Sequence, residues 1–346
     1  MKKYGKPYGD IASIKKSFVL DNEKLCVEDK NIEAAYSDGR KRKNCKICNE
    51  EIPWEGGQVF CYRGIHFDVC NICGHVNGEY DESEAFFHGV YDENDDSHAM
   101  LYYDVSSKEK YDDRVKRIYL PKVKFLEESI SRQGETYDKY NYLDLGTGAG
   151  YFVKALKDEA LNAKGIDVDK TEVNFGNTMI GTDALTCMKG TEVADYLRSC
   201  KFEVVSMIGV LEHVLDPNEI LYSLSTNDNV KYIYFSVPTI SFAMILGVIN
   251  PNMFNRVLGG WHTHIFSDDS IEYLLRKHGF ENIDEWRFGC DAADLDRFTQ
   301  IALLRQGNTC LAEIFHERFS PLTDDIQLLF DKSGFSSETH VVAKKS

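Results

Sequence analysis

Short apolar runs alternate with stretches of helical periodicity over the second half of the chain. Between the runs, apolar residues recur every three or four positions, as on one face of a helix. Strands that alternate with helices predict a parallel sheet with helices on both faces. The expected strands lie near 141–145, 163–167, 184–188, 203–208 and 230–237, with further strands at 283–288 and 339–344.

A glycine-rich turn follows the first of these strands. Gly146, Gly148 and Gly150 separate it from a helical pattern that begins near Tyr151. Glycine lets the backbone reach positive φ and lets a ligand approach without meeting a Cβ atom. Asp167 ends the next strand, where a carboxylate can bind two ribose hydroxyls. These residues predict a nucleoside-cofactor site, for which a dinucleotide and a sulfonium nucleoside compete.

The spacing of the glycines argues against the dinucleotide. A dinucleotide site requires Gly-x-Gly-x-x-Gly, and counting from Gly146 puts Tyr151 where the third glycine belongs. The run from Asp144 to Gly150 resembles the first motif of class I S-adenosylmethionine (SAM) methyltransferases. Residues 210–217, Val-Leu-Glu-His-Val-Leu-Asp-Pro, resemble the Leu-Glu-His-x-x-Asp-Pro signature of the small-molecule branch of these enzymes.

This resemblance implies an α/β fold with a seven-stranded, Rossmann-like class I methyltransferase sheet whose seventh strand is antiparallel. It also implies a helix before the first strand that closes over SAM, and the pattern at 110–129 fits such a helix, with a kink or break at Pro121. The cofactor-binding residues that follow are Asp144, Gly146, Thr147, Gly148, Gly150, Tyr151, Phe152, Asp167, Val168, Gly209, Val210 and Leu211.

Two Cys-x-x-Cys pairs form a second motif nearer the N-terminus. Cys45 and Cys48 are separated from Cys70 and Cys73 by 21 residues, the spacing of a four-cysteine zinc ribbon. Four thiolates around one zinc make a closed, structural site. The segments 58–63 and 65–69 between the pairs predict a hairpin. A redox pair or free thiols are the alternatives, and Cys61 and His66 are candidate substitute ligands.

Two histidines follow a Gly-Gly pair shortly before a helix that Ser267 is expected to cap. Methyl transfer to a hydroxyl or a carbon acid needs a base, and histidine, with a pKa near ~6.5, suits that role at neutral pH. The segment containing His262 and His264 resembles the Tyr-His-Glu-His stretch of zinc-ribbon sugar C-methyltransferases, which implies His264 as the base. His213 is the rival base.

Two positions depart from that stretch. Trp261 replaces its tyrosine and Thr263 its glutamate, so O-methylation is favoured over C-methylation. The arrangement of a zinc ribbon before a class I domain resembles enzymes of bacterial glycan pathways. That likeness implies a small polar acceptor such as a sugar, a nucleotide sugar or a glycan precursor.

Composition narrows the class of partner. A length of 346 residues predicts roughly two domains, and a hydrophobic content of 43% is enough for their cores. The 40 basic and 56 acidic residues give a net charge of −16. This balance argues against broad nucleic-acid or anionic-membrane binding. The longest apolar stretch, 240–249, is too short to span a bilayer, and the N-terminus lacks a signal segment. A cytoplasmic protein without a disulfide framework is therefore expected, despite the 10 cysteines.

The expected organisation is an N-terminal arm (1–40), a zinc ribbon (41–80), a linker with helical lead-in (81–135) and a methyltransferase domain (136–346). Insertions are expected at about 240–260, as a substrate lid or as core, and at 290–335, as a partner surface or a cover for the site. The expected cofactors are SAM and a structural zinc ion. One competing function is an RNA methyltransferase whose ribbon and basic residues 40–46 hold nucleic acid, and another is a non-catalytic SAM-binding module. Homo-oligomer formation is left open.

Overall fold

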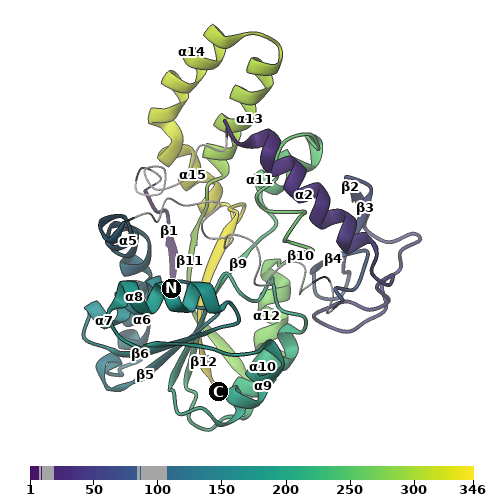
Figure 1. Cartoon of the computed structure of the whole chain (residues 1–346). Coiled ribbons are helices and arrows are strands. Elements are labelled where there is room, and N and C mark those ends of the chain that lie inside the picture. Colours follow the sequence, from purple (N-terminus) through teal and green to yellow (C-terminus); the bar gives the residue numbers. More distant parts are fainter. Residues whose placement is uncertain (8, 10–18, 84–85, 87–106) are drawn as a thin grey trace.

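The computed structural model describes residues 1–7, 9, 19–83, 86 and 107–346. Its main layer is an eight-stranded sheet in the order β1-β11-β12-β9-β8-β5-β6-β7 (Figure 1). Among these strands only β12 runs antiparallel to its neighbours, which confirms the expected seventh strand. The seven expected strands are β5 (Asn141–Leu145), β6 (Asn162–Asp167), β7 (Leu185–Cys187), β8 (Val204–Ile208), β9 (Tyr232–Pro238), β11 (Phe280–Phe288) and β12 (Glu338–Lys345).

The eighth strand comes from the segment expected to be an N-terminal arm. β1 (Lys2–Tyr4) pairs in parallel with β11 and extends the edge of the sheet. The ammonium group of Lys3 lies 4.3 Å from the ring centre of Trp286, and Lys2 forms an ion pair with Glu285 at 3.3 Å. A Lys-Lys-Tyr run has no apolar alternation, so sequence pattern alone does not predict this strand. Residues 10–18 of the expected arm lie outside the described residues.

Side chains of each strand alternate between two apolar cores, as the period of a β-strand requires. Leu143 and Val205 belong to a core that includes residues of α9 (Gly190–Ser199), α10 (Pro217–Thr226) and α12 (Asp268–Lys277). Tyr142 and Val204 belong to the core on the opposite face, with residues of α6 (Leu120–Arg132), α7 (Tyr151–Asp158) and α8 (Lys170–Ile180). The sheet is therefore covered on both faces, as predicted.

The helical lead-in is broken where expected. α5 (Lys108–Arg114) continues through a π-helical turn (Val115–Tyr119) into α6, and Pro121 lies in the first turn of α6. Proline is tolerated there because the first turn of a helix does not use its backbone N–H groups.

A second sheet contains the cysteine ribbon. β2 (Val59–Tyr62) and β3 (Ile65–Val69) form the predicted hairpin, and β4 (Val76–Gly78) pairs with β3. The fourth strand, β10 (His264–Ile265), comes from the second half of the chain and pairs with β4. The four cysteines belong to the same apolar core as Leu143 and Val205. The ribbon therefore packs against the main sheet and shares its core.

The two expected insertions are mainly helical. α11 (Phe242–Ile249) begins at Ser241, whose hydroxyl accepts a hydrogen bond from Met244 N–H. α13 (Asp291–Arg305) and α14 (Thr309–Phe319) extend away from the main sheet (Figure 1), and α15 (Thr323–Lys332) follows them. No helix in the described segments combines the length and apolar character needed to cross a bilayer.

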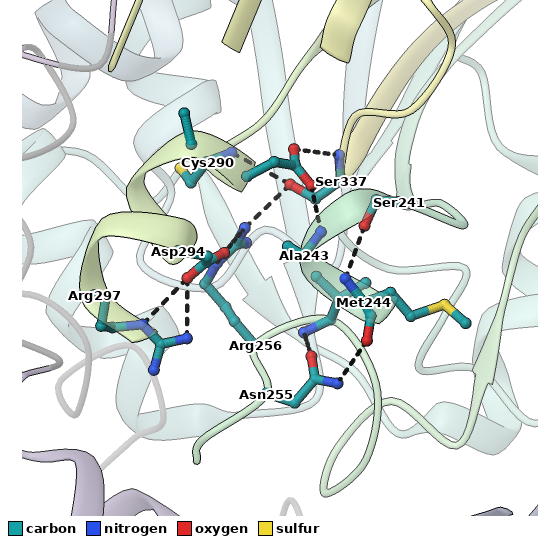
Figure 2. A network of polar contacts seen from close by, with 12 residues as sticks. Ser241, Ala243, Met244, Asn255, Arg256, Cys290, Asp294, Arg297 and Ser337 are labelled. Carbon is teal, nitrogen blue, oxygen red and sulfur yellow. Dashed lines mark hydrogen bonds and ion pairs between the residues drawn. The ribbon is translucent and has the colours of Figure 1, made fainter. Parts of the chain in front are cut away.

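A polar network joins the two insertions (Figure 2). Arg256 donates to the Asp294 carboxylate at 2.9 Å and to the Ser337 hydroxyl at 3.1 Å. Asn255 accepts hydrogen bonds from the backbone N–H groups of Val257 and Leu258. The segment that leads to His262 is thereby tied to α13 and to the start of β12.

The same segment is held from its other side by Arg63, at the turn of the β2–β3 hairpin. Its Nη1 lies 3.2 Å from the Asp29 carboxylate and 3.0 Å from that of Glu33, both in α2 (Asn22–Ser37). Its Nε donates to the Pro251 carbonyl at 2.7 Å and its Nη2 to the Met253 carbonyl at 3.0 Å. Arg63 therefore joins the ribbon, α2 and the 250–260 segment.

Replacing Arg63 with alanine is expected to lower the free energy of unfolding by about 3–5 kcal/mol, because two buried carboxylates lose their counter-charge. Burial already raises the pKa of Asp29 to about 7 despite the nearby guanidinium. Urea unfolding measures the loss. Arg198→Ala is the control, since its ion pairs are exposed and their removal should cost under about 1 kcal/mol. If both variants lost the same free energy of unfolding, the stabilising role of Arg63 beside Asp29 and Glu33 would be contradicted.

Candidate active site

The glycine-rich turn lies at the end of β5. Gly146, Gly148 and Gly150 all have positive φ. A Cβ at Gly146 would lie 2.6 Å from Val210 Cγ2, so this glycine lets the turn after β8 approach closely. A Cβ at Gly148 would meet no protein atom within 4 Å, so this part of the turn faces open space. A ligand can therefore approach the backbone at Gly148.

Asp167 braces this turn from the end of β6. Its carboxylate accepts the N–H of Gly148 at 2.6 Å and the N–H of Asp169 at 2.9 Å. Each carboxylate oxygen can accept two hydrogen bonds, so one lone pair on each remains for a ligand hydroxyl. A carboxylate with two free acceptors beside an open glycine turn fits the ribose of a nucleoside cofactor.

Asp144 occupies a different environment beneath the turn. It is buried, and Ser206 donates a hydrogen bond to its Oδ1 at 2.6 Å. Burial raises the pKa of Asp144 to about 7, although the bond from Ser206 opposes the shift. Its side chain therefore lies within the structure that supports the turn.

Aromatic residues of the helical lead-in cover the start of α7. The ring of Tyr151 stacks on Tyr111 with centres 4.6 Å apart and on Tyr119 at 5.4 Å. The Tyr111 hydroxyl donates to the Ala149 carbonyl at 2.9 Å, within the glycine-rich turn. Sequence periodicity placed Tyr119 on the buried stripe but missed Tyr111, because its partner lies nearly forty residues away.

The four cysteines lie together as predicted. Their Sγ atoms are all within 4.8 Å of one another, with Cys45 to Cys73 and Cys48 to Cys70 both at 3.5 Å. Two thiolates on one tetrahedral zinc lie about 3.8 Å apart. The donor set and its spacing therefore fit a zinc ion.

The two cysteine turns have the same backbone geometry. Cys45 N–H donates to Glu50 O and Asn49 N–H donates to Cys45 O. Cys70 N–H donates in the same way to His75 O, and Gly74 N–H to Cys70 O. Asn49 and Gly74 both have positive φ, as expected for residues that follow such a knuckle. Each turn thus presents two thiols toward one point.

His264, the expected base, requires a correction. It is in β10, is only 1% exposed, and shares a hydrogen bond with His75 of the ribbon (Nδ1 to Nε2, 3.0 Å). Burial lowers the pKa of His264 well below its usual value, and the charge of Lys46 lowers it further. Pairing of β10 with β4 therefore places this side chain at the junction between ribbon and main sheet, where its burial makes it a poor base.

His262 and His213 lie together at the carboxyl edge of the sheet. Their ring centres are 5.0 Å apart, and both residues are half-buried. His262 Nδ1 lies 2.9 Å from the Val257 carbonyl, so it carries the proton and leaves Nε2 as the basic nitrogen. Burial lowers the pKa of His262 to about 4 and keeps its ring neutral.

Glu212 completes this group. One ligand-type atom from each of Glu212, His213 and His262 lies within 4.8 Å of the other two. Burial raises the pKa of Glu212 to about 8; the negative charge of Glu338 adds to the shift and Lys122 opposes it. Sequence reasoning used Glu212 only as part of a motif and missed its role in this cluster.

The comparisons with known proteins decide the family. Residues 108–285, just over half of the chain, match the family described as "Methyltransferase domain". The chain belongs to this family. It is a SAM-dependent methyltransferase with a class I domain. No curated protein matches the sequence.

Solved structures similar to the enzyme have low sequence identity. A SAM-dependent methyltransferase from Archaeoglobus fulgidus is 18% identical, with 64% of this chain and 94% of that chain covered and a TM-score of 0.39. The magnesium protoporphyrin IX methyltransferase from Synechocystis PCC 6803 with bound SAH is 13% identical, with 77% and 96% covered and a TM-score of 0.42. The plantazolicin methyltransferase BamL is 16% identical, with 68% and 88% covered and a TM-score of 0.44.

Two of the expected cofactor residues of the methyltransferase have side chains that point away from the turn. Phe152 is buried in the core, with its ring centre 5.7 Å from that of Tyr234, and Leu211 is fully buried in the opposite core. Only their backbone atoms are available to a cofactor. Val168, by contrast, is half exposed directly after Asp167.

Another charged group beside the site was missed by sequence reasoning. Glu338, at the start of β12, accepts from His340 Nε2 at 2.7 Å and lies 3.8 Å from Lys122 Nζ. Burial raises the pKa of Glu338, but Lys122 and His340 outweigh it, so the pKa lies well below its usual range. These residues come from distant parts of the chain and only the folded sheet brings them together.

Proposed function

We propose that the enzyme transfers the methyl group of SAM to a hydroxyl of a small polar acceptor, of the sugar, nucleotide-sugar or glycan-precursor class. The observation that carries this proposal is the pair His213 and His262, which lies just after Gly209 at the edge where the glycine turn also ends. Two imidazoles beside the expected position of the methyl group suit an acceptor that must lose a proton. The departures at Trp261 and Thr263 from the C-methyltransferase stretch favour O-methylation over C-methylation.

We assign the cofactor to the open side of the glycine turn. SAM supplies a methyl group on a positively charged sulfur. Asp167 would hold the ribose hydroxyls and Val168 would pack against the base. Backbone and side-chain contacts would come from Gly146, Thr147, Gly148, Gly150, Gly209 and Val210, with the backbone of Tyr151, Phe152 and Leu211, while Asp144 supports the turn from below.

The acceptor side of the reaction follows from the two histidines. The acceptor oxygen attacks the methyl carbon, a C–O bond forms, and the electron pair of the C–S bond stays on sulfur. The hydroxyl proton passes to His213. His262, whose pKa is about 4, is too weak a base for that step and is suited to accept a hydrogen bond from the acceptor.

Ion pairs within the ribbon weigh against an RNA acceptor. Lys41 pairs with Glu79 at 3.2 Å, and both Arg42 and Lys46 pair with Glu82, at 2.6 and 3.0 Å. Three of the five basic residues proposed to hold nucleic acid are therefore neutralised within the protein. RNA retention that weakens steeply with salt would favour the RNA acceptor instead.

Isothermal calorimetry and an acceptor panel test the proposal together. S-adenosylhomocysteine should bind, and a panel of sugars and nucleotide sugars with labelled SAM should yield one methylated product. Binding of S-adenosylhomocysteine without turnover of any acceptor in the panel would favour the non-catalytic module.

The two histidine assignments predict different effects of alanine substitution. His213→Ala should lower kcat/KM by about 10²-fold or more while leaving the melting temperature unchanged. His264→Ala should instead destabilise the protein by about 1–3 kcal/mol, because it leaves His75 Nε2 buried without its partner. Steady-state kinetics and urea unfolding on both variants separate the two roles. A kcat/KM of the His213→Ala enzyme within about threefold of the wild-type value would exclude His213 as the base.

A further inference from the structure

The cluster of Glu212, His213 and His262 has the composition of a cation site. It offers one carboxylate oxygen and two imidazole nitrogens, all within 4.8 Å of one another. Ligands at about 2.1 Å from one ion lie up to about 4.2 Å apart, so a contraction of less than about 1 Å per side chain would bring all three onto it. The set of two histidines and one carboxylate leaves other coordination positions open.

Glu212 provides a second, independent observation. Its Oε2 is buried and has no hydrogen-bond partner among the residues that the structure describes. A buried carboxylate oxygen without a partner is costly, and native proteins normally satisfy it with a donor or a cation. Its Oε1 lies 3.6 Å from the position a Cβ would take at Gly209, so the carboxylate lies against the turn at the end of β8.

The orientation of His262 also supports a cation site. Its Nδ1–H donates to the Val257 carbonyl, which fixes the tautomer and directs the lone pair of Nε2 toward the cluster. Histidines that bind metals commonly have their other ring nitrogen held in this way. The Val257 carbonyl lies in a segment that Arg256 ties to α13 and Asn255 ties to α11 (Figure 2).

We propose that Glu212, His213 and His262 bind a divalent first-row transition-metal cation whose open positions take oxygen atoms of the acceptor. Imidazole nitrogens favour cations such as Mn²⁺, Fe²⁺, Co²⁺ or Zn²⁺, whereas Mg²⁺ and Ca²⁺ prefer oxygen ligands throughout. This site is distinct from the cysteine cluster, which is built from soft thiolates and has no open position.

The inference rests on the proposed function and deepens it. A hydroxyl bound to the cation has a lowered pKa, so with the cation present its proton passes to water and His213 acts as a ligand; His213 takes the proton itself only when the cation is absent. The oxygen then attacks the methyl carbon, and the C–S electron pair remains on sulfur as before. Acceptors with two neighbouring hydroxyls would be favoured, because both oxygens can occupy open positions of one cation.

Metal binding can be measured without an acceptor. Chelator-treated protein that retains the ribbon zinc is titrated with Mn²⁺, and free Mn²⁺ is followed by electron paramagnetic resonance. We expect one Mn²⁺ per chain in the wild type and at least tenfold weaker binding in Glu212→Gln and His262→Gln. His66→Ala is the matched control, since His66 is an exposed histidine that pairs with a carboxylate on the ribbon; its Mn²⁺ binding should be unchanged.

Co²⁺ separates the two metal sites in a second measurement. A tetrathiolate site gives a thiolate-to-metal charge-transfer band, whereas the Glu-His-His site does not. Protein produced with Co²⁺ in place of zinc should contain two Co²⁺ per chain, of which only one gives the band, and Glu212→Gln should lose only the ion that gives no band. Circular dichroism and melting temperature establish that each variant is folded.

The outcomes are distinguishable. Absence of Mn²⁺ binding by folded wild type, or binding unchanged by both cluster substitutions, overturns the cation site. S-adenosylhomocysteine calorimetry on the same preparations reports separately on the proposed function. If Glu212→Gln loses Mn²⁺ binding but still binds S-adenosylhomocysteine, both the cation site and the proposed function are supported. If the wild type binds Mn²⁺ but not S-adenosylhomocysteine, the proposed function is overturned and the cation site is retained.

Discussion

Replacing Cys70 with serine is expected to unfold the whole protein. Cys70 and the other three cysteines belong to the apolar core on one face of the main sheet, together with residues such as Leu143 and Val205. Structural zinc in small peptides supplies about 10–16 kcal/mol of binding free energy, comparable with the total stability of about 5–15 kcal/mol of an ordinary domain. Loss of a ligand therefore removes a large share of what holds the ribbon and the sheet together.

Several contacts join the ribbon to the main sheet, so we expect unfolding of the ribbon to destabilise the sheet as well. β10, from the second half of the chain, pairs with β4 in the sheet of the ribbon, and Lys277 of α12 donates to the Ile47 carbonyl in the first cysteine turn. A Cβ at Gly74 would lie 2.7 Å from the hydroxyl of Ser267, the residue that caps α12. Unfolding of the ribbon would expose this face of the sheet.

Circular dichroism, gel filtration and zinc content measure the effect of Cys70→Ser. Cys61→Ser is the matched control, because Cys61 is an exposed cysteine in the same ribbon and is absent from the four-cysteine cluster. We expect the control to keep the wild-type melting temperature and one zinc per chain. A Cys70→Ser protein that melts like the control would show that the thiolate cluster does not stabilise the fold.

Replacing Asp167 with alanine is expected to weaken S-adenosylhomocysteine binding by about 100-fold or more. Hydrogen bonds to a charged group contribute about 1.5–3 kcal/mol each, and on the proposed assignment the two ribose hydroxyls both bind this carboxylate. The substitution also removes the acceptor for Gly148 N–H, so the glycine turn loses its brace. Both effects act on the cofactor side of the site.

Asp169→Ala is the matched control for this experiment. Asp169 lies two positions further on and caps α8, accepting the N–H groups of Thr171 at 2.7 Å and Glu172 at 3.1 Å. Its loss should cost about 1 kcal/mol of stability but change binding only a few-fold. Calorimetry with S-adenosylhomocysteine on both variants gives the comparison, and equal binding by the two would refute the assignment of Asp167.

The position of the ribbon suggests how it contributes to the enzyme. Through β10 and Arg63 it contacts both ends of the segment 250–265, which carries His262. α2 approaches the same segment, since a Cβ at Gly260 would lie 2.4 Å from the Asp29 carboxylate. On the proposed assignment, the ribbon and α2 thus hold the acceptor side of the site, while the glycine turn holds the cofactor side.

Features that depend on neighbouring residues were predictable from the sequence. The strand that ends at Leu145, the glycine turn after it and the capping of α12 by Ser267 each follow from a few consecutive residues. The cysteine spacing likewise predicted the cluster, because each knuckle closes its own hydrogen bonds within six residues. Even the π-helical break before Pro121 was visible as an interruption of a periodic stripe.

Features that depend on distant pairing were decided only by the tertiary structure. His264 and His262 are two residues apart, and the sequence resemblance favoured His264 as the base. Pairing of β10 with β4 instead buries His264 against His75 and leaves His262 beside His213. β1 is a strand because β11 offers it an open edge, and Glu212 becomes part of a cluster because the 250–260 segment brings His262 to it. The sequence determined the sheet, the turn and the ribbon because local backbone preference and side-chain periodicity specify them. Long-range strand register and burial, which no short window of residues contains, decided which polar side chains face one another at the site.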